Sequence, residues 1–304
     1  MTADLQKSKI TVLMSTYNGE KYLTEQIESI LNQRNVDINL LVRDDGSTDQ
    51  TLTILKKYQE KGALEFYTGK NLGPQRSFLH LLQNAPQCDY YAFADQDDVW
   101  LEDKLYSGIS QLENAKGKPA LYFSQTQLTD ENLRPIPSII IHPKLTFGEM
   151  LVYKFIGGCT MILNHPLRKV IGTFIPVNMP MHDLWVYSIA LAADAHVVFD
   201  PNSHILYRQH GNNTIGQGQG FIYEWTLRLK RFATKKNDRY SQAQELANGY
   251  LSIMSEKNAT LLKLYLEGKQ NWRKRLSLMT NKELRCADRT TQILFWINVV
   301  CNKY

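Results

Sequence analysis

The 304-residue sequence predicts an α/β fold, in which a mostly parallel sheet is flanked by helices and followed by a helical C-terminal region. Short β-rich apolar runs alternate with helical periodicity along the first part of the chain. Polar loops follow several of these runs, and from about Trp225 the spacing of apolar residues is helical to the end. We therefore expect one domain over residues 1–220 and a basic helical region over residues 221–304.

The first unit is a strand, a loop, a helix and a second strand. The apolar run at 10–14 predicts the first strand, and Ser-Thr-Tyr-Asn-Gly at 15–19 is rich in turn and cap residues. Apolar residues at helical spacing over 22–31 predict a helix, and Leu-Leu-Val at 40–42 starts the second strand.

The same alternation continues after the second strand. That strand ends in Arg-Asp-Asp-Gly-Ser-Thr-Asp at 43–49, where Ser47, Thr48 or Asp49 can cap a helix through about Tyr58. The next predicted elements are a strand at 65–67, a helix at 77–82 after the break at 71–74, and a strand at 90–94. Strands that alternate with helices imply right-handed crossovers and parallel pairing.

Three polar loops follow strands of this predicted sheet, at 15–19, 44–47 and 95–98. In an open α/β sheet, ligands bind outside the carboxyl ends of the strands. The three loops lie at those ends, so we expect them to form a ligand site together.

The loop at 95–98, Asp-Gln-Asp-Asp, closes the fourth strand with three carboxylates. Their mutual repulsion raises their pKa values unless a cation neutralises them, and oxygen ligands suit Mg²⁺ or Mn²⁺. On an extended backbone Asp95 and Asp97 share a face. The alternative is that Asp97 and Asp98 cap the next helix while Asp95 is solvated.

Alternation is less regular after about residue 115. Further strands are expected at 121–123, 160–163 and 197–199, and a helix at 184–191. Gly157 and Gly158 precede one of these strands and allow close backbone approach to a ligand.

Composition indicates a globular protein, with 43% hydrophobic and 21% charged residues. Neither a bilayer-spanning run nor the apolar region of a signal peptide is found, so the sequence predicts a cytoplasmic protein with reduced cysteines. Residues 1–220 hold 19 Lys and Arg against 23 Asp and Glu, whereas residues 221–304 hold 16 against 7. The basic character therefore belongs to the C-terminal region.

These motifs together resemble the family 2 glycosyltransferases with the GT-A fold, over about the first 215 residues. The resemblance rests on an ordered set: Ser-Thr-Tyr-Asn-Gly at 15–19, Arg-Asp-Asp-Gly-Ser-Thr-Asp at 43–49, Asn-Leu-Gly at 71–73, Asp-Gln-Asp-Asp-Val-Trp at 95–100, Gly-Gly-Cys-Thr-Met at 157–161 and Met-His-Asp-Leu-Trp at 181–185. Within the family, Met-His-Asp and Tyr-Arg-Gln-His at 207–210 look most like bacterial rhamnosyltransferases that build cell-wall and capsular polysaccharides.

The resemblance implies a role for each matching residue. Asp183 matches the catalytic base of these inverting enzymes, and Asp45 would accept the N3–H of a pyrimidine base. Nucleotide binding is implied for Ser15, Thr16, Tyr17, Asn18, Asp44, Asp45, Arg76, Asp95 and Gln96. Metal binding is implied for Asp95, Asp97 and His210, and donor or acceptor binding for Asp98, Trp100, Gly157, Gly158, His182, Trp185 and Arg208.

Structural alternatives stand beside several of these roles. Asp44 can be a turn carboxylate that accepts the Gly46 and Ser47 amides. Arg76 can be a solvated arginine at a helix start, and Asp183 can cap the following helix. His182 can be a structural histidine.

The resemblance implies an inverting glycosyltransferase that uses Mg²⁺ or Mn²⁺ and transfers L-rhamnose from dTDP-β-L-rhamnose to a polysaccharide or lipid-linked acceptor, forming an α-linkage. The alternatives are a UDP-hexose or UDP-N-acetylhexosamine donor on the same fold, or a non-enzymatic nucleotide- or nucleic-acid-binding module. No nucleic acid is expected, because no RNA-module signature is found. A basic amphipathic pattern from Trp225 to about Lys236 indicates either peripheral contact with the inner membrane leaflet or packing on the main domain.

Overall fold

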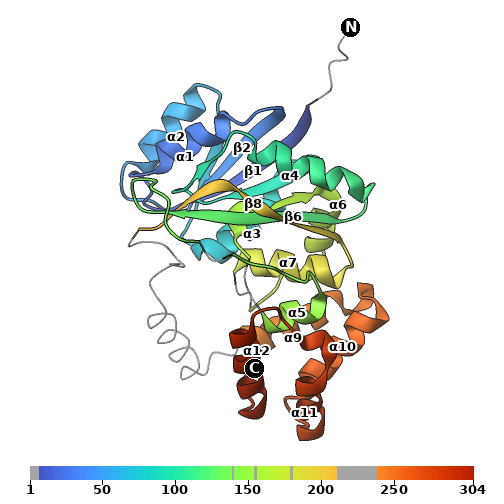
Figure 1. Ribbon diagram of the computed structural model, residues 1–304. Helices are drawn as coiled ribbons and strands as arrows, with labels where there is room; N and C mark the ends of the chain where they lie inside the picture. The colour runs from blue at the N-terminus through green and yellow to red at the C-terminus, as the bar shows by residue number, and fades with distance from the viewer. Residues whose placement is uncertain (1–6, 139, 154–155, 179–180, 211–237) are drawn as a thin grey trace.

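An eight-stranded sheet forms the centre of the molecule, and a group of helices extends beyond one of its faces (Figure 1). The computed structural model describes residues 7–138, 140–153, 156–178, 181–210 and 238–304. The strand order is β3-β2-β1-β4-β7-β6-β8-β5. The strands are β1 (Ser8–Thr16), β2 (Val36–Asp44), β3 (Glu65–Thr68), β4 (Tyr90–Ala94), β5 (Val99–Trp100), β6 (Ala120–Thr129), β7 (Ile162–Asn164) and β8 (His196–Arg208).

Parallel pairing predominates among the described strands, as the sequence predicted. β1 pairs in parallel with β2 and β4, β2 with β3, and β6 with β8. The antiparallel pairs are β4 with β7, β6 with β7, and β5 with β8. The N-terminal half of the sheet is thus wholly parallel, and the carboxyl ends of β1, β2 and β4 lie at one edge.

Helices cover both faces of the sheet, because the central strands are apolar at successive positions, which point to opposite faces. Val12 and Met14 pack against α1 (Leu23–Leu31), α2 (Thr51–Glu60) and α4 (Lys104–Leu112). Leu13 points to the other face. That face is covered by α3 (Gly73–Asn84), α5 (Phe147–Val152), α6 (His165–Ile171) and α7 (His182–Ala192).

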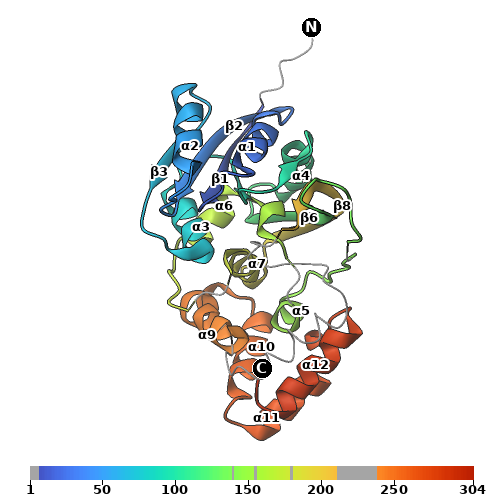
Figure 2. The ribbon, with the colours of Figure 1, turned by 90° about the vertical axis from the view of Figure 1, so that its left-hand side faces the viewer.

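Helix α7 lies between the sheet and the C-terminal helices, as Figure 2 shows. All of its residues are buried. Leu246 and Tyr250 of α9 belong to the same apolar core as Phe93 of β4 and Trp185 of α7. The C-terminal helices are α9 (Asp238–Tyr250), α10 (Glu256–Glu267), α11 (Trp272–Thr280) and α12 (Arg289–Val300).

The helical prediction for the C-terminal region is confirmed over residues 238–304. The boundary predicted at residue 220 and the basic amphipathic pattern beginning at Trp225 lie outside the described residues. Within the described part of the chain, no helix combines the length and the apolarity needed to cross a bilayer.

Several element starts differ from the sequence prediction. α3 begins at Gly73 rather than at residue 77, because Pro74 sits in its first turn, where a missing N–H costs nothing. α2 begins at Thr51, whose amide donates to Asp49. β7 begins only at Ile162, because residues Gly158–Thr160 form a 3₁₀ turn.

Candidate functional site

The loops after β1 and β4 are joined by the side chain of Gln96. Its Oε1 accepts the backbone N–H of Tyr17 at 2.9 Å, and its Nε2 donates to the Tyr17 carbonyl at 3.1 Å. The side chain packs against Gly19, where a Cβ atom would collide with the Gln96 amide. The amide of Gln96 therefore holds the loop after β1, and the nucleotide binding implied for Gln96 stays a prediction.

The loop after β2 is organised by the buried carboxylate of Asp44. Its Oδ1 accepts the amides of Gly46 and Ser47, both at 3.0 Å, and its Oδ2 accepts the Thr16 hydroxyl at 3.1 Å. The turn-carboxylate alternative thus describes the contacts of Asp44 in this structure. Asn18, with a left-handed φ of 48°, accepts the Thr48 amide at 2.9 Å and links the loops after β1 and β2.

Asp45 is buried beside Arg43, and the two form an ion pair. Oδ2 of Asp45 also accepts the Leu72 amide at 3.2 Å. Arg43 donates to the hydroxyl of Ser77, which in turn is 2.7 Å from the hydroxyl of Ser15. No role was predicted for Arg43, because no spacing pattern in the sequence indicates that an arginine of a strand forms a buried ion pair with a carboxylate.

The acidic residues after β4 form a compact group with a thiol. Ligand atoms of Asp95, Asp98 and Cys159 all lie within 4.8 Å of one another. The chain bends after Ala94 instead of staying extended, and the structure groups the carboxylate of Asp95 with that of Asp98. The charge of Asp97 acts on both of these carboxylates, so the metal role implied for Asp97 stays a prediction. Cys159 was missed, because nothing in its sequence surroundings indicates that the 3₁₀ turn brings it under β4.

Burial and like charge perturb this group strongly. Burial, followed by the charges of Asp97 and Asp183, raises the pKa of Asp95 to about 7. Burial, followed by the charges of Asp97 and Asp95, raises the pKa of Asp98 well above its ordinary value. Burial also raises the pKa of the Cys159 thiol well above its usual range, so the sulfur stays protonated.

The donor set fits a divalent cation held by oxygen. Oδ2 of Asp98 is buried and accepts no hydrogen bond from the described part of the chain. Carboxylate oxygens are the ligands that Mg²⁺ and Mn²⁺ prefer, whereas a protonated thiol is a poor ligand. Asp95 and Asp98 would therefore hold the ion, with Asp97 beside them.

Asp97 contacts residues at the end of β8 and just after it. Oδ2 of Asp97 lies 2.8 Å from Nε2 of His210, and the ring of His210 lies 5.0 Å from that of Tyr22. Arg208 forms an ion pair with Glu25, its guanidinium lies 4.4 Å from the Tyr22 ring centroid, and its Nε donates to the Asp97 carbonyl at 2.9 Å. The charge of Arg208 is thus matched by Glu25 in this structure, and the donor or acceptor binding implied for Arg208 stays a prediction.

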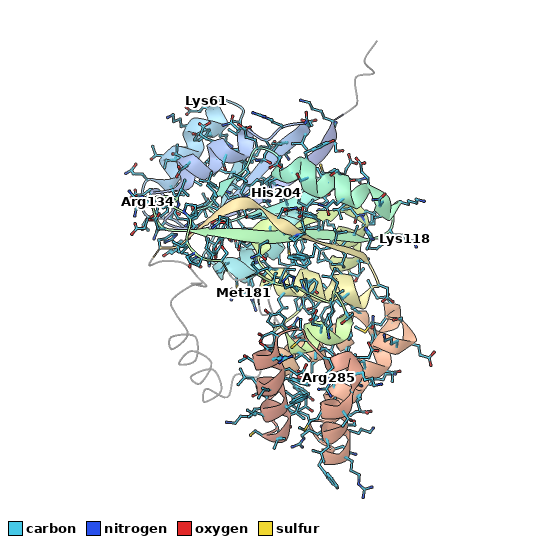
Figure 3. All side chains as sticks on the ribbon, viewed as in Figure 1. Lys61, Lys118, Arg134, Met181, His204 and Arg285 are labelled. Atoms are coloured by element: carbon cyan, nitrogen blue, oxygen red, sulfur yellow. The ribbon has the colours of Figure 1, made fainter. Side chains whose placement is uncertain are left out.

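Asp183 lies in the first turn of α7, close enough to Asp95 for its charge to raise the pKa of Asp95. The helix begins at His182, so Asp183 does not cap it, although its Oδ1 accepts the Leu184 amide at 2.6 Å. Met181, the residue before α7, lies just beneath the sheet (Figure 3). A negative side chain in the first turn is stabilised by the helix dipole.

His182 is buried, and neither ring nitrogen has a hydrogen-bond partner in the described part of the chain. Its ring stacks on Phe78 at 4.1 Å between centroids and meets Phe93 edge-on at 5.0 Å. Burial lowers the pKa of His182 to about 3, so the imidazole is neutral. Gly158 packs against this ring, which gives a packing reason for a glycine there, and the donor or acceptor binding implied for Gly158 stays a prediction.

Two tryptophans predicted to contact sugar are instead part of the core. Trp185 is fully buried and packs edge-on against Tyr250, with centroids 5.9 Å apart. Trp100 is buried under the Lys104 ammonium, which lies 3.6 Å from its ring centroid. Trp185 is enclosed because every residue of α7 is buried, and Trp100 of β5 is enclosed beneath Lys104 of α4.

Arg76 lies in the first turn of α3, outside the loops that follow the strands. Its guanidinium donates to the Val177 carbonyl at 3.4 Å, and the side chain is exposed. Gly157, the other glycine of the predicted pair, has only the Cys159 sulfur near its Cβ position, at 4.0 Å.

The model of glycosyl transferase family 2 matches residues 11–170. The chain belongs to this family. It is 28% identical over 258 residues to the dTDP-rhamnosyl transferase RfbG of Shigella flexneri, an alignment that covers 77% of this chain and 83% of the relative. The predicted resemblance to family 2 glycosyltransferases near the rhamnosyltransferases is confirmed.

Solved structures show the same fold. Residues 1–349 of TarS from S. aureus in complex with UDP-GlcNAc superpose with a TM-score of 0.58 at 18% identity, covering 96% of this chain and 90% of that one. The mannosyltransferase PcManGT from Pyrobaculum calidifontis in complex with GDP-Man and Mn²⁺ gives 0.55 at 15% identity, with coverages of 98% and 88%. The family 2 glycosyltransferase fold thus extends through the C-terminal helices.

Proposed function

We propose that this family 2 glycosyltransferase is inverting and metal-dependent, and that it transfers L-rhamnose from dTDP-β-L-rhamnose with formation of an α-linkage. The observation that carries the proposal is that Asp95 and Asp98 lie together at the carboxyl end of β4, with Asp183 close enough for its charge to raise the pKa of Asp95. The Shigella relative named as a dTDP-rhamnosyl transferase supports the donor. The acceptor, a polysaccharide or lipid-linked oligosaccharide, rests on the resemblance to polysaccharide rhamnosyltransferases.

Asp183 is the proposed base. Single displacement at the anomeric carbon needs a carboxylate to take the proton of the acceptor hydroxyl while the diphosphate departs from the opposite face. The position of Asp183 in the first turn of α7 stabilises its negative charge, as a base requires before the reaction. Its closeness to Asp95 brings the acceptor oxygen near the departing group.

Asp95 and Asp98 hold the diphosphate side of the donor, with Asp97 and His210 beside them. When bound, a divalent cation supplies electrostatic stabilisation of the negative charge that develops on the leaving diphosphate. Asp45 accepts the pyrimidine N3–H, and Arg43 fixes the direction of that carboxylate.

The test is a transfer assay with purified protein, Mg²⁺ or Mn²⁺, and polysaccharide or lipid-linked acceptors. We expect release of dTDP from dTDP-β-L-rhamnose, an α-linked product by NMR, and loss of turnover in EDTA. Turnover of UDP-glucose or UDP-GlcNAc without turnover of dTDP-rhamnose would eliminate the proposed donor and favour the alternative donors.

The base assignment has its own variant pair. Asp183→Asn removes the proton acceptor at nearly constant volume, so kcat should fall by about 10²–10⁴-fold with the melting temperature retained. Asp89→Asn is the matched control, because Asp89 is exposed just before β4, at the opposite edge of the sheet. Equal activity of the two variants would remove Asp183 from the mechanism.

A further inference from the structure

The C-terminal helices expose an apolar stripe. Ile293, Ile297 and Val300 of α12 are 52%, 44% and 59% exposed, and they lie four and three residues apart, which places them on one face of the helix. The opposite face of α12 packs on the core, because Phe295 and Val299 are buried there. The packing of the buried face of α12 does not explain why apolar residues also occupy its exposed face.

Helix α11 adds to this exposure. Trp272 is 62% exposed and Leu276, one turn later, is 47% exposed. Helices α11 and α12 contact each other and lie at the end of the molecule away from the sheet, where Figure 3 labels Arg285 (Figures 2 and 3). Clusters of large exposed apolar side chains usually mark an interaction surface.

Positive charge surrounds these apolar residues. Residues 272–304 hold seven lysines and arginines against two acidic residues. Arg273 and Lys274 directly follow Trp272, and Arg289 begins α12 on the side that carries Ile293. Two copies of so basic a surface would repel each other, whereas an anionic surface with an apolar interior matches both properties.

We propose that α11 and α12 form a membrane-docking surface, on which Ile293, Ile297, Val300, Trp272 and Leu276 enter the headgroup region of an anionic bilayer. The basic residues then contact the lipid phosphates. The sequence allowed a contact with the inner membrane leaflet anywhere in residues 221–304, and this proposal assigns it to two described helices that pack on the rest of the fold. If the acceptor is lipid-linked, as proposed above, the surface holds the enzyme at the bilayer where that acceptor lies.

The test is flotation of the full-length chain with vesicles of phosphatidylcholine, alone or with 30% phosphatidylglycerol, which requires no enzymatic activity. We expect binding to the anionic vesicles that is at least about tenfold stronger than to the neutral ones, together with a blue shift of tryptophan emission. The double variant Ile293→Asp/Ile297→Asp should lose this binding at least about tenfold. Tyr106→Asp is the matched control, because Tyr106 is 50% exposed on α4, at the other end of the molecule.

Three outcomes would overturn the proposal. The first is equal binding of the double variant and the wild type, and the second is no binding of the wild type to either vesicle. The third is a dimer in light scattering that Ile293→Asp/Ile297→Asp converts to monomer, which would make the stripe an interface between copies of the chain. Because vesicle binding is measured without substrate, failure of the proposed donor would leave this test unaffected.

Discussion

Gly158→Ala should disturb both the core and the active site, because Gly158 packs against the ring of His182. A Cβ atom at residue 158 would lie 2.5 Å from Nε2 of His182 and 3.3 Å from Cβ of Asp183. Van der Waals contact requires a retreat of about 1 Å. His182 cannot retreat freely, because the rings of Phe78 and Phe93 pack against it.

The expected cost of this overpacking is about 1–3 kcal/mol of unfolding free energy, or several degrees of melting temperature. Since Asp183 directly follows His182, a displacement of about 1 Å should also lower kcat by about 10²-fold. Differential scanning fluorimetry and the rhamnosyl transfer assay measure the two effects. Gly157→Ala is the control, because its Cβ atom would meet only the Cys159 sulfur at 4.0 Å.

A coupling to His182 would show that Gly158→Ala acts through the His182 ring, and not because residue 158 tolerates no side chain at all. In a His182→Ala background, Gly158→Ala should cost much less, and a double-mutant cycle should give a coupling of about 1–3 kcal/mol. Equal melting temperatures for Gly158→Ala and Gly157→Ala, or a coupling near zero, would refute the reasoning.

Three further predictions follow from buried charged and titratable groups. The pKa of His182 is about 3 in the folded protein and 6.5 in an unfolded chain, so only the unfolded state takes up the proton below pH 6.5. Stability is therefore lost as the pH falls from 6.5 towards 3, by about 2 kcal/mol at pH 5, and His182→Asn should lack this loss in urea titrations at pH 7 and pH 5. Asp98→Asn removes a buried carboxylate, so it should raise the melting temperature in EDTA while weakening Mn²⁺ binding at least about tenfold; tighter Mn²⁺ binding would contradict the ligand assignment. Arg43→Ala leaves the buried Asp45 carboxylate unpaired and should cost about 3–5 kcal/mol, much of which Arg43→Met/Asp45→Leu should restore; if the double variant is no more stable than the single one, the ion pair does not explain the loss.

The sequence predicted every described strand except β5, the helices α1, α2, α3 and α7, the helical C-terminal region and the edge of the sheet where the polar loops meet, but not α4, α5 or α6. It succeeded there because strand and helix periodicities are local, and because parallel pairing brings the carboxyl ends of successive strands together. β1 and β4, for example, end in the two loops that Gln96 joins. Membership of the family followed from the order of the motifs.

What sequence reasoning missed depends on three-dimensional packing. Trp185 lies in a helix whose residues are all buried. Because that helix has no polar face, its sequence pattern does not indicate whether the ring of Trp185 binds sugar or packs in the core. The bend after Ala94 brings Asp98, as well as Asp97, close to Asp95, which an extended backbone would not do. Cys159 reaches that cluster through a 3₁₀ turn more than sixty residues away in the chain, which no spacing rule predicts.

The two hydrogen bonds between Gln96 and the backbone of Tyr17 have a practical consequence for engineering. They hold the loops after β1 and β4 together as one unit, with Gly19 as the position that leaves room for the connecting amide. A chimera that imports a foreign segment 15–19 to change nucleotide preference must import residue 96 with it. Otherwise the transplanted loop would lose these two hydrogen bonds and would no longer be held beside the carboxylates that follow β4.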